Sequence, residues 1–151
     1  MDALDKKNVR LVFSMGTVSI ACWLISKVLF WYLIDVEYHG WAYAVYFLAA
    51  LTTCAAALAL DAFATALFYG FVRVKKGALV AVCAVLHGAV RVACAFYQGM
   101  FAIAGVFDFI MSSSARIDGP LLLTAVAVGY VFLFRFEKRL KAQRALRVTF
   151  D

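Results

Sequence analysis

Residues 78–107 read ALVAVCAVLHGAVRVACAFYQGMFAIAGVF, a continuous apolar stretch in which Arg91 is the only charged side chain. At 1.5 Å per residue, a helix of this length is about 45 Å long, whereas the hydrocarbon core of a bilayer is about 30 Å thick. The stretch therefore predicts a transmembrane helix that tilts or protrudes from the bilayer.

Three further apolar segments of this kind flank it, at residues 11–34, 41–72 and 119–134. Apolar residues make up 66% of the 151-residue chain, well above the roughly 45–50% of soluble domains. Four spans with short connections leave no room for a separate soluble domain. We predict an all-α integral membrane protein, in which residues 1–151 form one antiparallel bundle of four transmembrane helices. Residues 11–34 lack a small-residue cleavage site near their end, so we expect them to stay as a mature helix.

Basic residues predict the orientation of these spans. Twelve of the 15 lysines and arginines fall on one side of a four-span topology, and the opposite loops contain Arg116 among four acidic residues. Because cytoplasmic loops are enriched in lysine and arginine, we expect both termini on the cytoplasmic side or its equivalent, such as a mitochondrial matrix. The identity of the membrane stays open, with the mitochondrial inner membrane as one candidate.

Three charged residues, Lys27, Asp61 and Arg91, lie inside the predicted spans. Counted from the basic residues at the cytoplasmic ends of their helices, all three lie about 21–25 Å deep. Asp61 and Arg91 belong to consecutive helices joined by a short turn, so we predict an ion pair between them. His87, one turn before Arg91, is expected to share the carboxylate. Lys27 either joins this layer or extends toward the outer interface.

The third segment carries a stripe of small and polar residues. Its members recur at heptad spacing, which places them on one helical face; they are Ala84, Gly88, Arg91, Ala95, Gln98, Ala102 and Gly105. Small residues allow close helix approach in membranes, so we expect this whole face to point inward.

The charged layer has three interpretations. A buried Asp61–Arg91 pair can serve only to fix helix register, or the layer can form an ion or proton path, or it can contact a ligand. His87 also raises the question of haem ligation. The only other histidine, His39, is expected in an outer loop, so a haem would need a second subunit. We predict no resident cofactor and no metal site, since the four cysteines form no CxxC pair.

Six basic residues follow the last span without a helix breaker: Arg135, Lys138, Arg139, Lys141, Arg144 and Arg147. A polybasic segment next to a span attracts anionic lipid headgroups. We therefore expect residues 135–151 to form a basic helix that contacts lipids, with an acidic protein partner as the alternative. No aromatic or motif signal points to nucleic acid.

Motifs of zinc hydrolases, serine hydrolases, P-loop enzymes and dithiol oxidoreductases are absent from the sequence, which favours a non-catalytic protein. The leading hypothesis is a structural or accessory subunit of a multi-subunit membrane complex, with a respiratory-type assembly as one candidate. The alternative is a small oligomeric ion or proton channel, or a transporter, that uses Lys27, Asp61, His87 and Arg91. Other membrane subunits or further copies of the chain are the expected protein partners.

Overall fold

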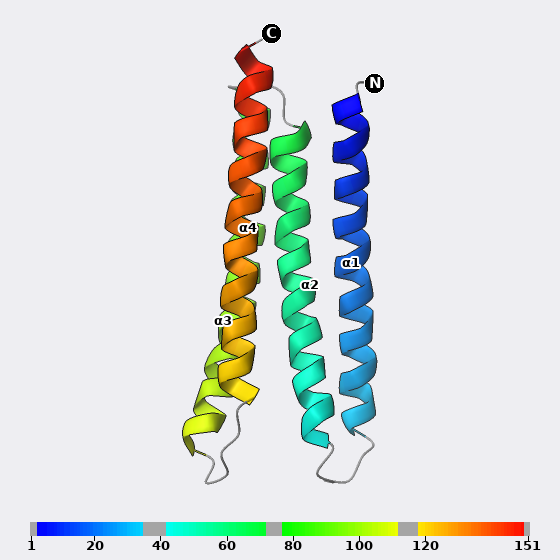
Figure 1. Ribbon diagram of the computed structural model, residues 1–151, viewed down its shortest axis with the longest axis vertical. Coiled ribbons are helices and arrows are strands. Elements are labelled where there is room, and N and C mark those ends of the chain that lie inside the picture. Colours follow the sequence, from blue (N-terminus) through cyan, green and yellow to red (C-terminus); the bar gives the residue numbers. More distant parts are fainter. Residues whose placement is uncertain (1–2, 35–41, 72–76, 112–117, 150–151) are drawn as a thin grey trace.

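The computed structural model describes residues 3–34, 42–71, 77–111 and 118–149. These residues form four helices, α1 (Ala3–Ile34), α2 (Ala42–Phe71), α3 (Ala78–Met111) and α4 (Asp118–Thr149). The helices lie lengthwise beside one another and successive helices run in opposite directions, so that both chain termini lie at the same end (Figure 1). We call this the termini end.

Each helix contains a segment long and apolar enough to cross a membrane, Lys6–Tyr32, Ala44–Gly70, Ala78–Ala104 and Pro120–Gln143. The chain is therefore all-helical in its described part, as expected of a multi-pass membrane protein. α1 begins two turns before the predicted span, and α4 continues well beyond Phe134, where the predicted span ends. Hydropathy alone ends a span where polar residues begin, whereas the helical hydrogen bonds continue until a breaker interrupts them.

Gly77 marks the start of α3. Its φ of 140° lies in a region that side-chain-bearing residues rarely adopt, and its carbonyl accepts a hydrogen bond from the Ala81 amide at 3.1 Å. Glycine lacks a Cβ and adopts this conformation without steric penalty, so it suits the turn into the helix.

α2 is the central helix of the molecule. It contacts the other three, whereas α1 contacts only α2, and α3 and α4 contact each other. The buried face of α2 is built largely from small side chains, Ala49, Ala50, Cys54, Ala56, Ala59, Ala62 and Ala66. Small residues let neighbouring helices approach closely, which explains why one helix can serve three neighbours.

The α1–α2 contact is pinned by hydroxyl groups. Ser19 donates to the Ala56 carbonyl at 3.0 Å, and the Ser26 and Thr53 hydroxyls contact each other. Thr53 also donates to the Ala49 carbonyl at 2.7 Å. These bonds satisfy polar groups that have no water partner inside a bilayer, so they fix the register of α1 on α2.

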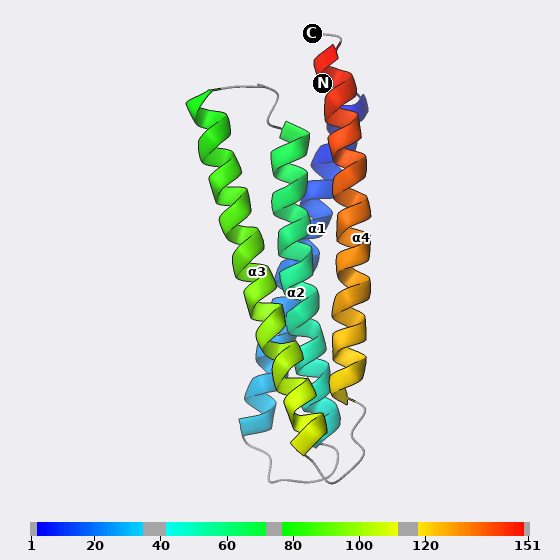
Figure 2. The same cartoon turned by 90° about the vertical axis from the view of Figure 1, so that its left-hand side faces the viewer.

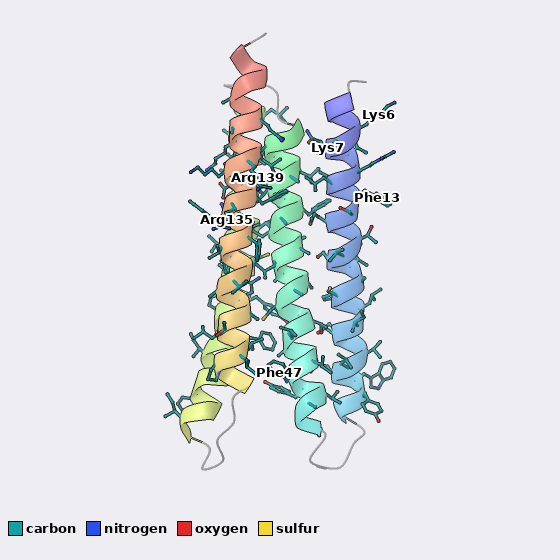
Figure 3. All side chains as sticks on the ribbon, viewed as in Figure 1. Lys6, Lys7, Phe13, Phe47, Arg135 and Arg139 are labelled. Carbon is teal, nitrogen blue, oxygen red and sulfur yellow. The ribbon has the colours of Figure 1, made fainter. Side chains whose placement is uncertain are left out.

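An apolar cluster fills the bundle at the end away from the termini. Ala50, Cys54, Leu122 and Val126 form its buried centre. Aromatic and aliphatic side chains close it, Phe47, Leu51, Phe101 and Tyr130. Phe47 of α2 lies at this end (Figure 3).

The expectation that one whole face of α3 points inward is wrong for half of the helix. Gln98 and Ala102 are buried, but Ala84 and Ala95 are exposed, and a Cβ on Gly88 would meet no atom within 4 Å. No side chain from Ala78 to Ala93 is buried. Figure 2 shows the reason, because α3 diverges from α2 and α4 toward the termini end. The environment of Gly105 lies outside the described side chains.

α4 approaches α2 closely at Gly129, where an added Cβ would overlap the Leu58 side chain. We expect Gly129→Val to lower the free energy of unfolding in detergent micelles by about 1–3 kcal/mol through overpacking. Leu58→Ala in the same chain should recover part of that loss, because it empties the space that the valine needs. Gly88→Val is the matched control, since its added side chain enters open space. Equal losses at the two glycines would contradict this packing.

Candidate functional site between α2, α3 and α4

An ion pair joins α2 to α3 inside the candidate spans. Asp61 on α2 is 1% exposed, and its Oδ2 lies 3.5 Å from Nε of Arg91 on α3. Asp61 lies about three turns before the end of α2, and Arg91 lies between three and four turns after the start of α3. These similar distances from the α2–α3 connection bring the two side chains to one level, as depth counting along the sequence predicts.

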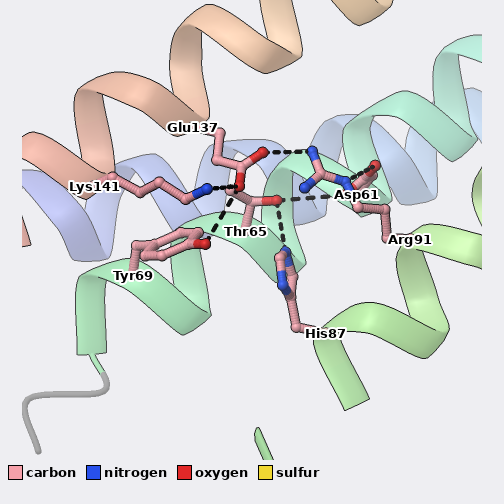
Figure 4. A network of polar contacts seen from close by, with 7 residues as sticks. All are labelled: Asp61, Thr65, Tyr69, His87, Arg91, Glu137 and Lys141. Atoms are coloured by element: carbon pink, nitrogen blue, oxygen red, sulfur yellow. Dashed lines mark hydrogen bonds and ion pairs between the residues drawn. The ribbon is translucent and has the colours of Figure 1, made fainter. Parts of the chain in front are cut away.

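Glu137 on α4 is the second acid of the site and is not among the residues predicted from the sequence. Its Oε2 lies 2.7 Å from Arg91 Nη2, and its Oε1 lies 2.7 Å from Lys141 Nζ, one turn further along α4. The Tyr69 hydroxyl donates to the same Oε1 at 3.3 Å. Figure 4 shows the resulting network, which draws side chains from all three helices.

A sequence signal for Glu137 does exist. It is the only acidic residue between Asp118 and the final residue, and it lies among six basic residues with Lys141 four positions later. Helical spacing of this kind places two side chains side by side. Because the predicted span ends at Phe134, hydropathy assigns this segment to a lipid-contacting tail and gives its single acid no role.

Thr65 connects His87 to Asp61. Thr65 Oγ1 donates to Asp61 Oδ1 at 3.3 Å and lies 3.0 Å from His87 Nε2. A hydroxyl has a single proton, so when Thr65 donates to Asp61, Nε2 must carry the proton that it shares with Thr65. The His87 ring stacks on Phe68 with centroids 5.2 Å apart and an interplanar angle of 2°. The hydrogen bond to Thr65 and the stacking on Phe68 together fix the orientation of the His87 ring.

The charges of the network balance. The two carboxylates of Asp61 and Glu137 face the guanidinium of Arg91 and the ammonium of Lys141. Intramembrane charges are tolerated when they are paired and hydrogen-bonded, because an isolated ion loses its hydration without compensation. Arg91 contacts both carboxylates and thereby joins three helices with one side chain.

One side of the network is open. The Arg91 side chain is 33% exposed and that of Lys141 is 54% exposed, although both lie inside candidate spans. Asp61 and Glu137 are buried. The carboxylates thus form the inner wall of the site and the cations form its rim.

The fourth residue of the predicted layer does not join the others. Lys27 is exposed on α1, with its Nζ 5.7 Å from the centroid of the Trp23 ring. α1 contacts only α2, and it is the neighbouring Ser26 that points into that contact. A helix turns by about 100° per residue, so burial of Ser26 directs Lys27 away from the bundle. The structure brings together Asp61, His87 and Arg91, and it leaves Lys27 outside.

The basic residues of α4 divide into two groups. Arg135, Lys138 and Arg139 are exposed, and Arg135 and Arg139 lie in the half of α4 nearer the termini end (Figure 3). Lys141 belongs to the ion network as well as to the basic segment. The side chains of Arg144 and Arg147 lie outside the described part of the chain.

Metal and haem ligation depend on the placement of histidine, cysteine and carboxylate side chains. Among the described residues, no group of three or more His, Cys, Asp or Glu side chains is arranged to hold a metal ion. The four cysteines are free thiols. His87 Nε2 contacts Thr65, and His39 lies outside the described residues.

Three buried oxygen atoms in this region have no hydrogen-bond partner: Asp61 Oδ2, Gln98 Oε1 and the Tyr130 hydroxyl. Arg91 lies at ion-pair distance from Asp61 Oδ2 but does not meet hydrogen-bond geometry. The amide nitrogen of Gln98 donates to the Cys54 carbonyl at 3.2 Å, which leaves its oxygen unpaired. Buried polar atoms are nearly always paired, so these three call for a physical explanation.

Comparison with protein-family models finds none that matches the chain, and comparisons with curated proteins and with solved structures find no match either. The chemistry of the site is therefore inferred from its geometry.

Glu137 provides the test of the network. We expect Glu137→Gln to lower the free energy of unfolding by about 1–3 kcal/mol, because Arg91 and Lys141 lose the carboxylate that they share. The expected loss is smaller than for a fully buried ion pair, because both cations are partly exposed. Denaturant titration in detergent micelles measures this loss. Lys138→Gln, which changes an exposed charge one position away, is the control, and a loss as large as that of Glu137→Gln would contradict the network.

Proposed function

We propose that the protein is a non-catalytic accessory subunit of a multi-subunit membrane complex, and that it binds a partner helix along the open half of α3. The observation that carries this proposal is the stretch from Ala78 to Ala93, in which no side chain is buried although the whole stretch lies inside a candidate span.

The composition of this face suits a protein partner better than lipid. Ala84 and Gly88 form a small-xxx-small pair on an open surface, and Ala95 continues it two turns further on. Membrane helices associate through such small residues, because these allow the backbones to approach. Arg91 lies on the same face and is one-third exposed, and a partner helix would shield it from the hydrocarbon.

The arrangement of charge supports a bilayer orientation. We place the termini end on the cytoplasmic or matrix side, because the basic residues concentrate there. In this orientation Arg135, Lys138 and Arg139 lie close to the level of Glu137 on α4, and their long side chains extend toward the headgroups on the side of the termini end. Anionic lipids are the proposed ligands of these exposed side chains.

Gly88 gives a sharp test of the partner surface. We expect Gly88→Leu to remove the associated subunits from the native mass spectrum of the gently extracted protein, because the leucine occupies the space of the partner backbone. Thermal stability of the purified chain should stay unchanged, since no described atom beyond the adjoining backbone of α3 lies within 4 Å of an added Cβ.

Ala93→Leu is the matched control. Ala93 is exposed on α3, nine residues after Ala84 and therefore about 180° around the helix. This variant should retain every associated subunit. Recovery of the wild-type protein as a lone monomer, or retention of the subunits by Gly88→Leu, would refute the proposed surface.

A channel or transporter is the second candidate, supported by the position of Asp61, His87 and Arg91 within candidate spans. It predicts ion or proton flux in liposomes that contain only this protein. Asp61→Asn should abolish that flux while the helical content and the oligomeric state stay unchanged. A flux equal to that of wild type would remove Asp61 from the pathway, and absence of flux in the wild-type protein would remove this candidate.

A further inference from the structure

A second polar layer lies below the ion network. On each of the three helices a polar group occurs seven residues from a member of the network, in the direction away from the termini end: Cys54 from Asp61 on α2, Gln98 from Arg91 on α3, and Tyr130 from Glu137 on α4. Seven residues make two helical turns, about 10.5 Å, and return to the same helical face. The three groups therefore share one level and one interface.

Contacts support this placement. Gln98 spans the α2–α3 interface through its bond to the Cys54 carbonyl. Tyr130 packs against the apolar cluster that contains Cys54. The Gln98 side chain is completely buried, so bulk solvent does not reach its free oxygen.

The three unpartnered atoms are chemically complementary to water. Asp61 Oδ2 and Gln98 Oε1 accept hydrogen bonds, and the Tyr130 hydroxyl donates one and accepts others. Two acceptors cannot pair with each other, whereas separate water molecules can donate to each of them and accept from the tyrosine hydroxyl. Buried waters typically bind polar atoms that the protein leaves unsatisfied.

A metal cation fits the same atoms less well. Arg91 Nε already lies 3.5 Å from Asp61 Oδ2, so a cation on that oxygen would be repelled by a guanidinium. Water carries no net charge and leaves the balance of the ion network unchanged.

We propose that ordered water molecules bridge Asp61 Oδ2, Tyr130 and Gln98 Oε1 in the interior of the α2–α3–α4 contact. These waters extend the polar network by two helical turns into the bundle and end at the apolar cluster of Ala50, Leu122 and Val126. The proposal holds for an accessory subunit and for a channel, because it rests on hydrogen-bond satisfaction alone.

Water-edited solid-state NMR of the labelled protein in liposomes tests this hydration. We expect magnetisation to pass from water to the Gln98 and Tyr130 side chains several-fold faster than to Thr53. Thr53 is the matched internal control, because it is buried and polar but its hydroxyl is satisfied by the Ala49 carbonyl and Ser26. Transfer to Gln98 as slow as to Thr53 would overturn the proposal.

A substitution distinguishes water that bridges Tyr130 and Gln98 from hydration of the bundle that does not depend on Tyr130. Tyr130→Phe removes one water ligand without changing side-chain volume much, so transfer to Gln98 should fall several-fold. Tyr46→Phe, which alters an exposed tyrosine on α2, should leave that transfer unchanged. Unchanged transfer in Tyr130→Phe, with helical content retained, would show that no water joins the two side chains. If Tyr130→Phe fails to fold, Gln98→Met gives the reciprocal measurement at Tyr130, with the same two outcomes.

Discussion

The arrangement of α2, α3 and α4 depends on how a guanidinium can be kept inside a span. Arg91 achieves this by lying between two carboxylates, Asp61 on one helix and Glu137 on another. A single carboxylate would neutralise its charge but leave the remaining donors of the guanidinium without partners. The second carboxylate, Glu137, brings α4 into contact with Arg91. The need to pair the Arg91 guanidinium therefore determines which helices meet and at what level.

The same interaction lies where α3 changes from open to packed. Arg91 and His87 reach across to partners on α4 and α2 in the part of α3 that diverges from its neighbours (Figure 2). Beyond Arg91, the short side chains of Cys94 and Ala102 allow α3 to approach, and burial begins there. The open half follows from this geometry, and with it the small-residue face that we assign to a partner.

The side chains of α2 are small where its neighbours place larger side chains against it. Its alanines accept α1 on one side and α4 on another, and Gly129 of α4 makes room for Leu58. Polar contacts occur at separate interfaces, with Ser26 and Thr53 toward α1 and Asp61 and Thr65 toward α3. Each of these interfaces therefore has its own polar contact, which fixes the register of the two helices and favours the correct pairing among similar apolar helices.

The sequence by itself determined the helical class, the four apolar segments and the common level of Asp61 and Arg91, because these depend on hydropathy and helical rise, which are properties of each segment alone. Only the tertiary structure decided that Glu137 completes the network, that Lys27 points away from it, and that Ala84 and Gly88 stay uncovered. The first outcome depends on which helices touch, the second on the rotation of α1 about its axis, and the third on the divergence of α3 from α2 and α4 toward the termini end. A rotation of about 100° moves a side chain from the interior to the exterior without altering its depth or its hydropathy, so depth counting does not detect it.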